Sequence, residues 1–378
     1  MRMIYLDHNA TTPIAPEVRE AMLPYLTDEW GNPSSAYRFG SKLKTAIETA
    51  REQVSRLIGA LPQEVLFTSC ATESNNAAIH AALKSNPSKR HIVTSVVEHS
   101  SVLTYCTALE NDGYRVTRLP VDREGLLSVP DLENTITEET AIVSLMWANN
   151  ETGVLFPIRE IARTCREHGV LFHCDAVQAV GKVAIDLCQI SLDYLSLSAH
   201  KIYGPKGIAA LYVRQDSPFV PLIHGGNQEH GRRGGTENIP NIVGLGKAAE
   251  LAQSRLKDYS TQIRSLRDEL ETEVLKSISG TEINGHRVLR LPNTANIAFP
   301  GIESDALMAL LDNAGICASK GSACLGNSDG VSHVISAMKV GDLTARQSLR
   351  FSLGFGSTQG DVSESVSTLI RNVAALRA

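Results

Sequence analysis

Apolar runs of strand length alternate with amphipathic segments of helix length along the first two thirds of this 378-residue chain. The expected strands cover residues 64–68, 91–97, 115–119, 141–146, 170–174, 193–197 and 208–213. The expected helices between them include residues 41–58, 72–83, 100–110 and 158–168. Such alternation is typical of a parallel sheet with helices on both faces. We therefore predict an α/β fold with a mostly parallel seven-stranded sheet, whose ligands lie beyond the carboxyl ends of its strands.

A long helical stretch begins near Asn241 and carries the chain away from this sheet. The later segments favour a small α+β unit, with strands or helices at 294–299, 306–311, 348–353 and 363–376. A chain of this length exceeds one ordinary core. We predict a large domain over residues 13–250 and a small domain formed by residues 1–12 and 251–378.

Composition limits the classes of partner. Lys and Arg number 36 against 41 Asp and Glu, which gives a formal net charge of −5. Since no basic run occurs either, we expect neither nucleic acid nor an anionic membrane as a partner. No apolar run is long enough to span a bilayer, and the N-terminus lacks a signal-peptide core. The seven cysteines include no CxxC pair, which favours a cytoplasmic protein with reduced thiols and no metal site.

A lysine and an aspartate stand at the ends of two expected strands. Lys201 follows one strand and precedes a glycine–proline turn, and Asp175 follows another. Pyridoxal phosphate needs a lysine on its aldehyde and a carboxylate on its ring nitrogen, which keeps the ring an electron sink. Most lysines are solvated surface charges, so Lys201 alone would indicate little. The two residues together predict a pyridoxal-phosphate enzyme.

Three further segments end a strand with polar residues. The backbone N–H groups of Ala71 and Thr72 would suit a phosphate, although a helix capping box around Thr72 explains the same pattern. Asn149 and Asn150 could bind a ring hydroxyl or a carboxylate, or could form a polar turn. His99 precedes a helix, where it could stack on a planar ring and move protons.

Three residues in the last sixth of the chain complete the candidate chemistry. Cys324 lies in a segment that contains three glycines and few apolar side chains, which predicts a loop. A thiol there could act as a nucleophile, and an exposed thiol without function is the alternative. Arg346 and Arg350 lie near an apolar strand, where an arginine needs an anionic partner such as a substrate carboxylate.

Taken in order, these segments resemble the class V aminotransferase family, and within it the cysteine desulfurases of the NifS/IscS type. The resemblance covers nearly the whole chain and implies the fold of the pyridoxal-phosphate-dependent transferases. The segments that carry it include Asp7-His8-Asn9-Ala10-Thr11-Thr12, Ala71-Thr72-Glu73-Ser74, Asn149-Asn150-Glu151-Thr152-Gly153, Asp175-Ala176-Val177-Gln178, Ser198-Ala199-His200-Lys201, Gly234-Gly235-Thr236-Glu237-Asn238 and Arg350-Phe351-Ser352-Leu353-Gly354.

The resemblance also implies roles for individual residues. Lys201 would bind the cofactor aldehyde and Asp175 the ring nitrogen, while His99 would stack on the ring and Gln178 would bond its hydroxyl. Asn150 would contact the cofactor and help to hold the substrate. The phosphate would be cradled by Ala71, Thr72, Ser198 and His200.

The remaining implied roles concern the substrate, the sulfur and a second subunit. Arg350 would hold L-cysteine together with Asn150, and Cys324 would accept its sulfur. Thr236 would reach the cofactor of the other subunit, so the resemblance implies a symmetric homodimer.

We therefore expect a cysteine desulfurase that converts L-cysteine to L-alanine. Lys201 would remove the α-proton, His99 would move a proton to or from a thiol, and Cys324 would pass the sulfur as a persulfide to an acceptor. That acceptor would be an iron–sulfur scaffold or another protein. The metal would be bound by this iron–sulfur partner, and none by the chain itself. A selenocysteine lyase or a direct cysteine C–S lyase of the same fold is the alternative. A weakly catalytic partner subunit is a second one, against which the presence of both Lys201 and Cys324 argues.

The sequence departs from the family pattern at several positions. Ala199 and Cys70 replace glycines, and both are small enough to be tolerated. Lys320 stands where serine is usual, and Leu-Gly-Asn follows Cys324 where Thr-Ser is common, so the charge of this segment differs. The family's C-terminal extension is absent from the sequence, which leaves docking to a standard scaffold protein open.

Overall fold

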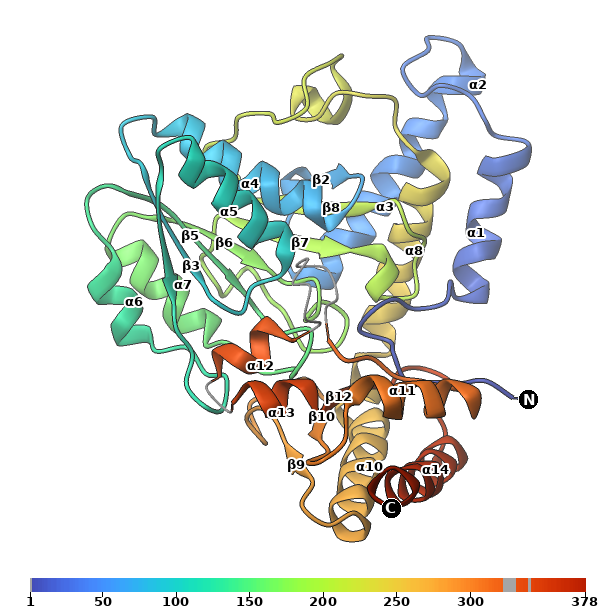
Figure 1. The fold of residues 1–378 in the computed structure, drawn as a ribbon. Coiled ribbons are helices and arrows are strands. Elements are labelled where there is room, and N and C mark those ends of the chain that lie inside the picture. The colour runs from blue at the N-terminus through green and yellow to red at the C-terminus, as the bar shows by residue number, and fades with distance from the viewer. Residues whose placement is uncertain (1, 322–330, 339–340) are drawn as a thin grey trace.

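The computed structural model describes residues 2–321, 331–338 and 341–378. Its largest sheet has seven strands in the order β2-β8-β7-β6-β5-β3-β4 (Figure 1). Strand β8 is antiparallel to both of its neighbours, and the other neighbouring pairs are parallel. The predicted mostly parallel seven-stranded sheet is therefore confirmed. Its strands are β2 (Val65–Thr68), β3 (His91–Ser95), β4 (Arg115–Leu119), β5 (Thr140–Met146), β6 (Leu171–Asp175), β7 (Tyr194–Ser198) and β8 (Ala209–Val213).

Helices cover both faces of this sheet, as expected for parallel strands that are buried on both sides. On one face α4 (Ala71–Ser85) and α5 (Ser100–Asn111) pack against alternate strand residues such as Leu66 and Ile142. On the other face the neighbouring residues Val65 and Val143 meet a second group of helices. That group consists of α1 (Pro16–Thr27), α3 (Leu43–Ile58), α7 (Ile158–Glu167) and α8 (Ile239–Ser254).

A second unit lies beneath the large sheet in Figure 1 and has its own hydrophobic core. Its three-stranded antiparallel sheet has the order β12-β10-β9, and a short strand pair joins β1 to β11 in parallel. Three helices, α10, α11 and α14, pack around these strands. The bounds are β1 (Ile4–Tyr5), β9 (Glu282–Ile283), β10 (Thr294–Ala298), β11 (Ile316–Cys317), β12 (Ser348–Ser352), α10 (Arg264–Ser277), α11 (Ser304–Asn313) and α14 (Gln359–Arg377).

The core of this second unit contains Ile4 and Leu6 together with residues between 259 and 373. This grouping supports the proposed small domain, although the boundary at residue 250 stays a prediction because it lies inside α8. A π-helical turn at Tyr259–Ile263 links α8 and α9 (Leu256–Asp258) to α10. The other short helices are α2 (Arg38–Ser41), α6 (Val129–Thr135), α12 (His333–Ala337) and α13 (Asp342–Arg346).

The described part of the chain contains no helix with the combined length and hydropathy of a membrane span. Within the same residues, no group of His, Cys, Asp and Glu side chains is arranged to hold a metal ion.

Candidate active site

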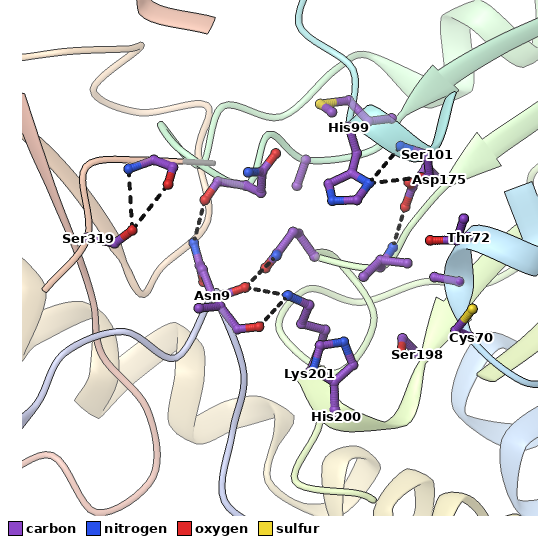
Figure 2. A pocket seen from close by; sticks show the side chains of 18 of the residues that line it. Asn9, Cys70, Thr72, His99, Ser101, Asp175, Ser198, His200, Lys201 and Ser319 are labelled. Atoms are coloured by element: carbon purple, nitrogen blue, oxygen red, sulfur yellow. Dashed lines mark hydrogen bonds between the residues drawn. The ribbon is translucent and has the colours of Figure 1, made fainter. Parts of the chain in front are cut away.

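A cavity of about 370 Å³ lies at the carboxyl ends of the parallel strands. It brings together ten of the residues that the sequence indicated, and Figure 2 shows many of them from close by. Cys324 lies outside the described residues, but Ser319 and Gly321 of the same segment line the cavity. The ten residues are Ala71, Thr72, His99, Asn150, Asp175, Gln178, Ser198, His200, Lys201 and Arg350.

Lys201 stands in the middle of the cavity, on a single 3₁₀ turn that follows β7. Its Nζ donates hydrogen bonds to the backbone oxygens of Asn9 at 2.6 Å and Ala10 at 2.8 Å. The turn is tied to the same N-terminal segment, because Thr12 donates to the carbonyl of His200 through both its N–H and its hydroxyl. Residues 9–12 therefore fix the position of the amine.

Asp175 ends β6 and is held by two donors. One carboxylate oxygen accepts from Asn75 Nδ2 at 2.8 Å, and the other accepts from the N–H of Val177 at 3.0 Å. Asn75 also donates to the hydroxyl of Ser101 at 2.8 Å. The carboxylate is thus fixed in direction at the wall of the cavity, where a cationic N–H group of a ligand could pair with it.

His99 caps the N-terminus of α5, and this role sets its tautomer. The backbone N–H of Ser101 donates to His99 Nδ1 at 3.1 Å, so Nδ1 must be the acceptor and a neutral ring carries its proton on Nε2. Burial lowers the pKa of His99, although the negative charge of Asp175 opposes this effect. The ring is therefore neutral at neutral pH, and Nε2 is the nitrogen that can exchange a proton.

The end of the cavity that contains Cys70, Thr72 and Ser198 can hold an anion. Figure 2 shows Cys70, Thr72 and Ser198 together on this side and Ser319 on the other, with Lys201 between them. Helix α4 begins at Ala71 with an extended Cys70 as its N-cap, and no side chain caps it. The capping box around Thr72 is therefore wrong as an explanation. The N-terminal N–H groups of α4 stay available for a phosphate.

His200 borders this end of the cavity as an uncharged group. Burial, reinforced by the positive charges of Lys201 and Lys206, lowers the pKa of His200 to about 4. Its Nδ1 lies 3.1 Å from the hydroxyl of Thr11. His200 can therefore contribute a hydrogen bond to an anion at neutral pH, but no charge.

Arg350 is almost fully buried and has a protein partner that the sequence analysis did not foresee. Its Nη2 lies 2.6 Å from Asp7 Oδ1 and its Nη1 donates to the carbonyl of Asn150 at 2.9 Å. Nε has no hydrogen-bond partner among the described residues. The backbone of Arg350 also pairs with that of Ser319 at 2.6 and 3.1 Å. The guanidinium is thus held against the cavity by one carboxylate and one carbonyl.

Thr236 does not line the main cavity of its own chain. It lines a separate cavity of about 200 Å³ with Thr68, Ser69 and Arg233, whose guanidinium pairs with Glu73 at 2.9 Å. Arg346 is not part of the main cavity lining either.

Sequence reasoning missed several residues that build the site. Asn9 and Ala10 belong to one of the family-like motifs, which was the available signal, whereas Asn75 and Ser101 gave no signal beyond their helical positions. Glu98 is a further unpredicted group. Burial raises its carboxyl pKa to about 8, and it accepts from the Ser95 hydroxyl and the N–H of Met146.

A family model described as Aminotransferase class-V matches residues 4–364. The chain belongs to this family. "Cysteine desulfurase 2" of Trichormus variabilis is 50% identical over 378 residues, which cover 100% of this chain and 95% of that protein. "Cysteine desulfurase NifS" of Azotobacter vinelandii is 47% identical over 378 residues, covering 100% of this chain and 94% of that protein.

Solved structures agree with this membership. A NifS-like protein superposes with a TM-score of 0.93 at 36% identity, covering 99% of this chain and 100% of that chain. "SspA in complex with cysteine" superposes with a TM-score of 0.82 at 39% identity, covering 92% of this chain and 98% of that chain. The resemblance on which the sequence analysis drew is confirmed, and so is the fold that it implied.

Proposed function

We propose that this protein is a pyridoxal-phosphate-dependent cysteine desulfurase. It converts L-cysteine to L-alanine and takes up the sulfur as a persulfide on Cys324. The observation that carries the proposal is the meeting of Lys201, Asp175 and the N-terminus of α4 in one cavity. The names of the relatives, cysteine desulfurase and NifS, support it independently.

The residues of the cavity fit the cofactor. The N–H groups at Ala71 and Thr72 suit its phosphate, and Asp175, oriented by Asn75, suits a protonated ring nitrogen. Lys201 Nζ would bind the aldehyde. The bound cofactor would supply an electron sink for the bond cleavages at the substrate. Gln178, His99, Asn150, Ser198 and His200 would complete its binding site.

The other groups of the site hold the substrate and move protons. Arg350 and Asn150 would bind the carboxylate of L-cysteine, with Asp7 fixing the direction of the guanidinium. Lys201 would take the α-proton once its amine is free. His99 would exchange a proton with a thiol through Nε2, because Nδ1 is occupied by the N–H of Ser101.

The sulfur step transfers one sulfur atom between two thiols. The Cys324 thiolate attacks the sulfur of the substrate, a new S–S bond forms and the C–S bond breaks. The electron pair of that bond stays with the carbon, which takes up a proton. L-Cysteine and the Cys324 thiol thereby give L-alanine and a Cys324 persulfide. A thiol reductant or an acceptor protein then removes the outer sulfur.

The products test this proposal. Purified protein supplied with pyridoxal phosphate, L-cysteine and a thiol reductant should form alanine and sulfide in equal amounts. Pyruvate and ammonia in place of alanine would identify a direct C–S lyase. A far higher kcat/KM for L-selenocysteine than for L-cysteine would identify a selenocysteine lyase instead.

We also propose a cytoplasmic homodimer that delivers sulfur for iron–sulfur cluster assembly, either to a scaffold or to another acceptor protein. Thr236 supports the dimer because it lies apart from the main cavity of its own chain, as expected of a residue that serves the partner's cofactor. The NifS name of one relative supports the role in cluster assembly. Sedimentation at the mass of two chains is the check on the dimer.

Replacing the Arg350 guanidinium should impair substrate binding despite conservation of charge. Arg350→Lys is expected to lower kcat/KM for L-cysteine by roughly tenfold to a hundredfold, mainly through KM, because one ammonium cannot serve Asp7, the Asn150 carbonyl and a substrate carboxylate together. Asp7→Asn is the matched control, since its amide oxygen still accepts from Nη2 and the loss should be smaller. Unchanged kinetics in Arg350→Lys would mean that Arg350 serves only the protein carboxylate.

A further inference from the structure

Lys182 is a lysine in an unusual environment. Only 2% of its surface is exposed, and no ion pair involves it among the residues that the structure describes. Its Nζ donates to Gln178 Oε1 at 2.8 Å. Burial, followed by the positive charges of Lys201 and Arg350, lowers the pKa of this amine well below its usual range. Lysine is rarely buried without a charged partner, because burial of its amine is unfavourable. A contribution to the stability of the fold therefore does not explain why Lys182 is present.

The amide that Lys182 contacts belongs to the wall of the active-site cavity. Gln178 Nε2 donates to the backbone oxygen of Asn9 at 2.9 Å, and Lys201 Nζ donates to the same oxygen at 2.6 Å. The two nitrogens are neighbours because they share one acceptor. In pyridoxal phosphate the ring hydroxyl is attached next to the carbon that carries the aldehyde. A cofactor bound to Lys201 would therefore bring its hydroxyl oxygen close to the Gln178 N–H₂ group.

The contact with Lys182 acts together with the Asn9 carbonyl to determine which end of the carboxamide faces the cavity. A carboxamide can rotate and exchange its oxygen and nitrogen unless its neighbours distinguish them. Here the oxygen accepts from Lys182 and one N–H donates to the Asn9 carbonyl, so the second N–H is left for the cavity. The chain reversal between the two residues passes through Gly181 at φ +74°, where a Cβ would lie 2.8 Å from Ile202 Cγ2. Glycine thus allows Lys182 to turn back toward Gln178.

We propose that Lys182 is a positioning residue for the cofactor's ring hydroxyl. It holds the Gln178 oxygen away from the cavity, so that the N–H₂ group donates to the hydroxyl oxygen. The inference rests on the proposed function, because it requires pyridoxal phosphate on Lys201.

The test is a double-mutant cycle with Lys182→Met and Gln178→Leu. Cofactor-free protein is titrated with pyridoxal phosphate, and both the affinity and the wavelength of the visible band are recorded. Lys182→Met should weaken the affinity by roughly twofold to tenfold, as expected for one neutral hydrogen bond, and should shift the band. In the Gln178→Leu background the same substitution should add no further change, because Lys182 acts through that amide.

The unfolding temperature of the variants distinguishes a positioning role of Lys182 from a purely structural role. Methionine has a similar length and buries no amine, so the unfolding temperature of cofactor-free Lys182→Met should hold or rise. Lys182→Gln keeps an N–H donor and should retain most of the affinity, whereas Lys182→Leu removes the donor and carries the comparison with Gln178→Leu if the methionine variant does not fold. The matched control is Lys276→Met, which removes an exposed lysine of α10 that does not line the cavity and should change neither quantity.

Two outcomes would overturn the inference: an unchanged affinity and spectrum in Lys182→Met, or equal losses with and without the Gln178 side chain. Failure of the proposed function has a different signature. In that case neither Gln178→Leu nor Lys201→Ala would alter the binding of pyridoxal phosphate.

Discussion

Lys201→Ala is expected to abolish both the covalent attachment of pyridoxal phosphate and the release of sulfide from L-cysteine. The amine of Lys201 lies in the middle of the cavity, where the carbonyls of Asn9 and Ala10 fix its position. No other lysine lines that cavity within the described residues. Borohydride reduction of wild-type protein followed by peptide mapping should place the cofactor on Lys201. The fall in kcat should reach several orders of magnitude, since attachment and α-proton removal are lost together.

The control for this prediction is the unfolding temperature. Alanine removes an amine that donates to two backbone oxygens, so a moderate loss of stability is expected, of about 1 kcal/mol for each hydrogen bond. The protein should remain folded. Cofactor trapped on another lysine of the folded variant would contradict the assignment of Lys201.

Cys324→Ala should stop sulfide release and leave cofactor binding intact. Cys324 accepts sulfur in the proposed reaction, whereas the groups proposed to bind the cofactor all lie elsewhere in the chain. L-Cysteine should therefore still change the visible spectrum of the variant, because that change depends on Lys201 and Arg350. The measurement is a cysteine-induced spectrum recorded beside a sulfide assay, and wild-type protein should additionally yield a persulfide-bearing peptide that contains Cys324.

Cys188→Ala is the matched control, since Cys188 is exposed and does not line the main cavity. Its sulfide release should equal that of the wild type. Near-normal sulfide release from Cys324→Ala would favour a direct C–S lyase, which needs no thiol on the protein.

The large sheet could be predicted from sequence because its inner strands are buried on both faces. Such strands appear as short, nearly continuous apolar runs, and β5 and β7 are buried at every residue. The strand ends then indicated where Asp175 and Lys201 would meet. Strand limits were less accurate: β3 ends at Ser95 rather than Val97, because the chain turns there to place Glu98 and His99.

What the sequence could not provide were contacts between segments far apart in the chain. Asp7 and Arg350 are separated by 343 positions, and no periodicity links them. In the sequence Asn75 has the pattern of an ordinary residue of an amphipathic helix. Its amide reaches Asp175 only because α4 packs on the sheet. The boundary between the two domains was hard to place for a similar reason, since α8 continues through it without a break.

The attachment of the N-terminal segment to β12 has a consequence for how the protein is made. The N–H of His8 donates to the carbonyl of Ser352 at 3.0 Å, and the N–H of Asn9 donates to the hydroxyl of the same serine at 3.0 Å. His8 and Asn9 must therefore wait for a strand whose Ser352 is synthesised 343 positions after Asn9. Contacts of such long sequence separation form late, because the intervening chain must be ordered before they gain anything. We therefore expect the carbonyls that hold Lys201 to settle only after β12 has been synthesised, and stable binding of pyridoxal phosphate to follow that step.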